Sequence, residues 1–173
     1  IYFLFFFLIS VTFIYAQPIK IMLVTGGHDF DTLQFFEMFD GLPGIEYEHF
    51  EQPKANRELV KNQAEDFDVI VFYDMWKSIS EVEKSAYLNL TQQGKPLLFL
   101  HHSIASYQDW PEFEKILGGK YVEAARGVPK EEQSNYEHDV WVYTKVENYT
   151  AVTVGLKETR YFDKIYGISL KKN

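Results

Sequence analysis

Two nearly uninterrupted apolar runs constrain the fold of this chain more than any other feature. They are Asp68–Tyr73 (DVIVFY) and Leu97–Leu100 (LLFL), and both are shorter than an ordinary helix. A strand of this composition needs apolar cover on both faces, which is the situation of inner strands in a parallel sheet. We therefore expect both runs to be central strands of a sheet that helices cover on both sides.

Strand and helix patterns alternate around these runs. Further strands are expected at Ile19–Thr25 and Ile45–Phe50, and helices over Asp31–Phe39, Asn56–Ala64, Ser80–Leu90 and Trp110–Leu117. Ser80 and Glu83 have the spacing of a capping box, which marks the start of the third helix. Alternating strands and helices imply βαβ units with right-handed crossovers. The sequence thus predicts an α/β fold with a doubly wound, flavodoxin-like, mainly parallel sheet.

The pattern changes after Lys120. Further strands are expected at Tyr121–Ala124, Asp139–Val146 and Tyr161–Ile165. In the flavodoxin-like order the first two strands lie beyond Asp68–Tyr73, so a second neighbour for Leu97–Leu100 has to come from this part of the chain. The alternation in Asp139–Val146 is that of a half-exposed edge strand. We therefore expect incomplete cover at this edge of the sheet.

Composition narrows the possible partners. A length of 173 residues suits one domain, and 46% hydrophobic residues can build a core. The formal charge is −8 and no cluster of lysines and arginines breaks the acidic pattern, which argues against a nucleic-acid partner. The chain has no cysteine, so disulfides, thiolate metal sites and cysteine nucleophiles are excluded.

The first residues indicate an exported protein. Ile1–Tyr15 is almost wholly apolar and uncharged, and Ala16 closes it. A membrane-spanning helix needs roughly 20 apolar residues, more than this run has. A small residue after a short apolar stretch is typical of a signal peptide. We expect residues 1–16 to be a signal peptide and residues 17–173 to be the mature chain, periplasmic or extracellular and without a membrane span. The alternative is a buried N-terminal strand or helix.

Polar and aromatic side chains gather where the predicted strands end. Ligands of an open parallel sheet bind outside the carboxyl ends of its strands. The candidate residues follow the first, third and fourth strands: Gly27, His28, Asp29 and Phe30; Asp74 and Trp76; His101, His102, Ser103, Tyr107 and Trp110. Aromatic faces beside hydrogen-bonding groups suit a carbohydrate, because its C–H faces stack and its hydroxyls pair.

The candidate catalytic residues are His28, His101, His102 and Asp74, and the remaining seven are candidate substrate contacts. Neutral imidazoles at His28 and at His101 or His102, with Asp74 nearby, would suit a divalent metal ion such as zinc. Neighbouring residues on a strand face opposite ways, so one of the two adjacent histidines is expected to pack away from the site.

Structural roles stay open for several other candidates. Asp29 or Asp31 could cap the helix that follows. Trp76 and Trp110 are as consistent with core packing as with a ligand platform, and Gly26-Gly27 with a tight turn.

Three separated blocks resemble the ThuA-like (trehalose-utilisation) family. They are Leu23–Phe30, Asp68–Asp74 and Gly94–Ala105, and the segment from Trp110 to Tyr121 continues the similarity. The resemblance implies a class I glutamine amidotransferase-like fold and an association with disaccharide and keto-sugar metabolism. In the related amidotransferases a cysteine nucleophile follows the corresponding strand. His101 stands in that place and cannot form a thioester, so glutamine amidotransfer is excluded.

This sequence also departs from the ThuA-like family in one respect. ThuA-like domains continue past the position of Gly167 with further strands, a histidine-containing segment and a last helix, which are missing from this sequence. We therefore expect a C-terminally incomplete ThuA-like domain. Two hypotheses follow: an enzyme that acts on a carbohydrate or keto-sugar, or a non-catalytic carbohydrate-binding or accessory domain, including an inactive fragment.

Overall fold

A four-stranded parallel sheet organises the structure, a computed structural model that describes residues 17–124, 127–146, 150 and 153–167. The strands are β1 (Ile19–Gly26), β2 (Ile45–Glu51), β3 (Val69–Asp74) and β4 (Leu97–Phe99). Their order is β2-β1-β3-β4, and each neighbouring pair is parallel. The expected α/β class and the flavodoxin-like strand order are thus confirmed.

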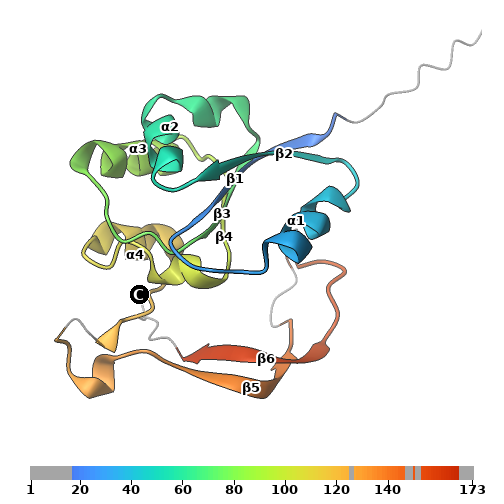
Figure 1. The fold of residues 1–173 in the computed structure, drawn as a ribbon, viewed down its shortest axis with the longest axis vertical. Coiled ribbons are helices and arrows are strands. Elements are labelled where there is room, and N and C mark those ends of the chain that lie inside the picture. Colours follow the sequence, from blue (N-terminus) through green and yellow to red (C-terminus); the bar gives the residue numbers. More distant parts are fainter. Residues whose placement is uncertain (1–16, 125–126, 147–149, 151–152, 168–173) are drawn as a thin grey trace, which may run out of the picture.

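Helices cover both faces of the sheet (Figure 1). On one face lies α1 (Thr32–Asp40), and on the other lie α2 (Lys54–Val60), α3 (Glu81–Gln92) and α4 (Pro111–Leu117). Side chains alternate along β1, so that Ile21 and Leu23 pack with α1 whereas Met22 and Val24 pack with the other three helices. Strand β1 is therefore buried from both sides.

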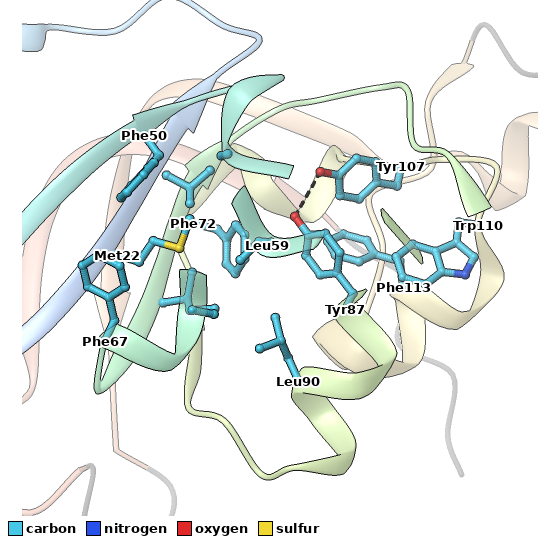
Figure 2. Packing of buried hydrophobic residues seen from close by; sticks show 14 residues of the cluster. Met22, Phe50, Leu59, Phe67, Phe72, Tyr87, Leu90, Tyr107, Trp110 and Phe113 are labelled. Carbon is cyan, nitrogen blue, oxygen red and sulfur yellow. Dashed lines mark hydrogen bonds between the residues drawn. The ribbon is translucent and has the colours of Figure 1, made fainter. Parts of the chain in front are cut away.

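The larger core lies between the sheet and α2, α3 and α4. Figure 2 shows its aromatic part, in which Tyr87 of α3 packs with Phe72 of β3 and with Phe113 of α4, at ring-centroid distances of 5.6 and 6.1 Å. Phe72 and Tyr87 are almost completely buried. Burial of a large apolar side chain contributes roughly 1.5–3 kcal/mol, so this cluster stabilises the packing of α2, α3 and α4 on the sheet.

Local signals set the helix ends. The capping box is present at α3: the Ser80 side chain accepts a hydrogen bond from the Glu83 N–H, and the Glu83 carboxylate accepts one from the Ser80 N–H. At α4 a proline opens the first turn, and Gly118 ends the helix with a left-handed φ of +84°. The expected helix Asn56–Ala64 is wrong in extent. It divides into α2 and the 3₁₀ helix η1 (Gln63–Asp66), because Asn62 between them has a left-handed φ of 63°.

The prediction that Leu97–Leu100 is a central strand of the sheet is wrong. The segment forms the short strand β4, which pairs with β3 alone within the sheet of described residues. Leu98 is 49% exposed. The apolar composition of the segment indicated burial. The strand instead lies at an edge of the described sheet.

The C-terminal strands do not join this sheet. They are β5 (Asn135–Thr144) and β6 (Thr159–Gly167), which form an antiparallel hairpin with a bulge between Glu137 and Val140. The expectation that this part of the chain supplies the second neighbour of Leu97–Leu100 is thus wrong for the described residues. The segment Tyr121–Ala124, expected as a strand, is irregular.

The hairpin lies below the strand ends and below α1 (Figure 1). Of the helices that the described residues form, none combines the length and apolar character needed to cross a membrane. The predicted signal peptide, residues 1–16, lies outside the described residues.

Candidate functional site

Three histidines from two loops meet at the carboxyl edge of the sheet. His28 follows β1, while His101 and His102 begin the 3₁₀ helix η2 (His101–Ala105) after β4. The ring centroids of His28 and His102 are 4.5 Å apart, and those of His101 and His102 are 4.0 Å apart. The structure thus brings together the three histidines that the sequence singled out.

Gly27 allows the first loop to approach the others. Its φ is +83°, and a Cβ atom at this position would lie 2.3 Å from the carbonyl oxygen of Met75. The Met75 N–H donates a hydrogen bond to the oxygen of Gly26, at 2.8 Å, which holds the two loops together. Only glycine fits this combination of close contact and backbone conformation. Gly27 therefore shapes the site through its backbone.

His28 is fixed by two backbone carbonyl groups. Its Nδ1 lies 3.1 Å from the oxygen of Asp29, and its Nε2 lies 3.3 Å from the oxygen of Tyr73. A neutral imidazole has one N–H, so it can donate to one of these oxygens at a time. The rings of Phe30 and Tyr73 also pack on the His28 ring, with centroids 5.6 and 5.0 Å away. These contacts hold the ring against the strand ends.

His101 and His102 differ from the expected strand geometry. They lie in a 3₁₀ turn, and His101 has a left-handed φ of 50°. The expectation that the side chains of His101 and His102 face opposite ways is therefore wrong, and the two rings lie edge to face. A left-handed conformation is uncommon for residues other than glycine and often marks a functional turn.

Both histidines are held in the neutral form. Burial, followed by the nearby positive charges of His101, His28, Lys164 and Lys77, lowers the pKa of His102 to about 4. Burial also lowers the pKa of His101, with Lys164 and His28 adding to the effect. Neutral imidazoles can accept a proton or a hydrogen bond at neutral pH.

Asp74 lies on the opposite face of the sheet from Tyr73 and takes part in a buried network. Its carboxylate accepts hydrogen bonds from Gln52 Nε2 at 3.0 Å and from Ser103 Oγ at 3.2 Å. Burial raises the pKa of Asp74 to about 6, although these two hydrogen bonds act in the other direction. Ser103 is itself fully buried and links η2 to β3. Asp74 and Ser103 therefore hold η2 against the end of β3 through buried hydrogen bonds.

Tyr107 and Trp110 belong to the core. Tyr107 is 2% exposed, and its hydroxyl donates to Asn56 Oδ1 at 3.0 Å and lies 3.1 Å from the hydroxyl of Tyr87 (Figure 2). Trp110 stacks on Phe113 with a centroid distance of 5.7 Å. These rings are covered by protein, so the structure gives both residues a packing role instead of an exposed face for a ligand.

The remaining candidates are divided between surface and core. Asp29 is exposed beside His28, whereas Trp76 is half-buried and packs against the larger core. Asp31 precedes α1 but its side chain makes no capping hydrogen bond, so the capping role weighed for it is wrong. The sequence analysis did not identify Gln52. This residue follows β2, so applying the rule that ligands bind at the carboxyl ends of parallel strands to that strand would have pointed to it.

The geometry does not fit the divalent metal ion that the sequence suggested. Across residues 17–124, 127–146, 150 and 153–167, no three histidine, aspartate or glutamate side chains are placed to hold one. Asp74 is engaged with Gln52 and Ser103, and both ring nitrogens of His28 face carbonyl oxygens.

A small hollow opens beside His102, between the strand-end loops and the hairpin. Its volume is about 170 Å³, and Met75, His102, Ile104, Ala105, Tyr121, Glu123, Tyr136 and Lys164 line it. The apolar floor comes from the strand-end loops, and the hairpin adds a cation and a phenol. The Lys164 ammonium lies 4.2 Å from the ring centroid of Tyr136. Glu123 pairs with Lys77 at the rim. We call this space the His102 hollow.

The fold and the strand-end site define an α/β domain of ThuA-like architecture. Two crystal structures of proteins described as "putative thua-like protein" superpose on it. The protein from Parabacteroides merdae gives a TM-score of 0.64 at 17% identity, over 87% of this chain and 63% of its own. The protein from Bacteroides uniformis gives a TM-score of 0.60 at 16% identity, over 92% and 64%. This chain thus spans less than two thirds of the length of either structure.

Sequence comparison alone identifies no relative of this chain. No family model matches the chain, and no curated protein matches it. The similarity to the two crystal structures supports a ThuA-like fold, and the function has to be argued from the site.

Proposed function

We propose that this chain is an exported domain that acts on a carbohydrate or keto-sugar bound in the His102 hollow. The observation that carries the proposal is the meeting of three histidines from two loops beside a hollow that also contains a lysine. Drug-sized ligands fill pockets of roughly 300–1,000 Å³. A hollow of about 170 Å³ suits a smaller ligand, such as one sugar ring.

The side chains of the hollow match the chemistry of a keto-sugar. The imidazole of His102 is neutral at pH 7, so its ring can accept a hydrogen bond from a sugar hydroxyl. The Lys164 ammonium lines the same hollow, where it can stabilise the negative charge that develops on the sugar oxygen. Met75 and Ala105 offer apolar contact to the C–H face of the ring.

Calorimetric titration of the full chain tests this proposal. Fructose serves as the keto-sugar probe, with glucose and trehalose for comparison. We expect His102→Gln to weaken fructose binding at least tenfold, because the hydrogen-bonding imidazole and its ring contacts are lost. His49→Gln is the matched control, since His49 lies on β2 and bonds to Thr25 away from the hollow. Equal affinity for wild type and His102→Gln would contradict the proposal.

A second candidate function is a carbohydrate-binding module without turnover. The burial of Asp74 favours it, because this carboxylate is occupied by Gln52 and Ser103 and is not directed at the hollow. Sugar analysis by chromatography after prolonged incubation separates the two. Conversion of a bound sugar that His102→Gln abolishes would establish an enzyme, and binding without conversion would favour the module.

Export is a separate part of the proposal and rests on the composition of Ile1–Tyr15 and Ala16. Mass spectrometry of the secreted protein should find an N-terminus at Gln17. A secreted chain that retains residues 1–15 would contradict it.

A further inference from the structure

One face of the hairpin carries exposed rings and cations. In the register of β5 and β6, Trp141 lies opposite Phe162 and Tyr143 lies opposite Arg160. Opposite residues share a face of the sheet, and so do residues two apart on one strand. Trp141 is 55% exposed and Tyr143 is 70% exposed. We call the face that holds Tyr136, Trp141, Tyr143, Arg160, Phe162 and Lys164 the aromatic strip.

Charge is divided between the two faces of the hairpin. Both cations of β6, Arg160 and Lys164, lie on the aromatic strip. The opposite face carries Glu137 and Asp163 instead. The strip is therefore locally positive on a chain whose formal charge is −8. This sign favours an anionic ligand on one face only.

Arg160 is held in place by the rings. Its guanidinium carbon lies 4.0 Å from the ring centroid of Trp141 and 5.1 Å from that of Tyr143. The rings cover the flat side of the guanidinium and leave its N–H groups at the edge. Within the described part of the chain, no carboxylate forms an ion pair with Arg160. A guanidinium in this setting is suited to bind a carboxylate through two parallel hydrogen bonds.

The aromatic strip continues into the His102 hollow. Tyr136 and Lys164 belong to both. Arg160 and Lys164 are four residues apart on one strand, which places them about 13 Å apart along it. That separation exceeds one sugar ring, so a sugar ligand that reaches both cations needs more than one unit.

We propose that the aromatic strip binds an oligosaccharide that carries carboxylate groups, with one end of the oligosaccharide in the His102 hollow. The inference rests on the proposed sugar site and adds its substrate class. Trp141 and Tyr143 supply stacking surface, while Arg160 pairs with a carboxylate on a sugar unit outside the hollow.

Titration calorimetry of the full chain with three probes tests this inference. The probes are trigalacturonate, the single unit galacturonate, and the neutral trisaccharide maltotriose. We expect trigalacturonate to bind at least tenfold more tightly than maltotriose, with an affinity that falls as salt is raised. Arg160→Gln should lower the trigalacturonate affinity at least fivefold and leave galacturonate binding unchanged. Lys115→Gln, which removes one positive charge from an exposed position of α4, is the matched control and should bind as wild type.

The outcomes separate this inference from the sugar site itself. Equal trigalacturonate affinity in wild type and Arg160→Gln, or equal affinity for the two trisaccharides, would overturn the aromatic strip as a binding surface. So would a dimer in light scattering that Trp141→Ala dissociates, because a second copy would then cover the strip. If His102→Gln leaves galacturonate binding intact, the His102 hollow fails, while an effect of Arg160→Gln would still support the strip.

Discussion

The ring of His28 lies against the ring of His102, with centroids 4.5 Å apart, although the two residues come from loops after different strands. The contact has an electrostatic consequence. His28 contributes to the lowered pKa of His102, next to burial and the charge of His101. The two loops are therefore coupled through the protonation of one ring.

Replacement of His28 should raise the pKa of His102. In His28→Gln the positive field of the ring is lost and water gains access, so the pKa should move from about 4 toward the ordinary value of 6.5. The measurement is an NMR titration of the imidazole Cε1 proton. His49→Gln should leave the midpoint of His102 where it is in wild type. A midpoint of His102 that does not move in His28→Gln would contradict the coupling.

Asp74→Asn should stabilise the protein at neutral pH. Burial raises the pKa of Asp74 from 3.8 to about 6, so its stabilising contribution is complete below pH 3.8 and is lost as pH rises through 6. At pH 7 the variant avoids burying a charge, which is worth roughly 3 kcal/mol for two pKa units. The amide can still accept from Gln52 and donate to Ser103. Chemical denaturation at pH 4, 5.5 and 7 measures the effect, and a variant less stable than wild type at pH 7 would disprove it.

Gly27→Ala should destabilise the protein and distort the site. The new Cβ would lie 2.3 Å from the Met75 oxygen, and the φ of +83° is unfavourable for alanine. Gly44→Ala is the matched control, because Gly44 has a φ of +74° but no atom within 4 Å of the added Cβ. We expect about 1–2 kcal/mol for the control and clearly more for Gly27→Ala. Equal losses in thermal denaturation would show that the contact with Met75 is unimportant.

Tyr107→Phe should affect stability and leave sugar binding unchanged. The hydroxyl is buried between Asn56 and Tyr87, and Asn56 Oδ1 keeps its hydrogen bonds from Gln52 and Tyr87 when it is removed. The expected cost is about 1 kcal/mol. A large loss of fructose affinity in a folded variant would return Tyr107 to the site where the sequence placed it.

The main sheet and the residues at its carboxyl edge could be predicted because they depend on local patterns. Apolar runs such as Asp68–Tyr73 mark parallel strands, and the strand-end rule then finds His28, His101 and Asp74. The rule places residues at an edge but does not say on which face of the sheet each side chain lies. Asp74 and Tyr73 are adjacent, yet they face opposite sides, and this separates Asp74 from the histidines.

The parts that could not be predicted depend on contacts between distant segments. Lys164 reaches the hollow because the hairpin folds under the sheet, and no pattern in Tyr161–Ile165 specifies where that hairpin docks. Tyr107 looked like a ligand contact because it follows the histidines in sequence. Its burial arises from Tyr87 and Asn56, which come from α3 and α2.

An NMR titration of the histidine rings with fructose tests the central claim most directly, because each of the five histidines of the chain reports on its own surroundings. If the sugar binds in the His102 hollow, the imidazole signals of His28, His101 and His102 should shift together and saturate, while the His49 signal stays in place. A saturating shift confined to His49 or His138, or fructose binding without any shift of the His102 signal, would contradict the account.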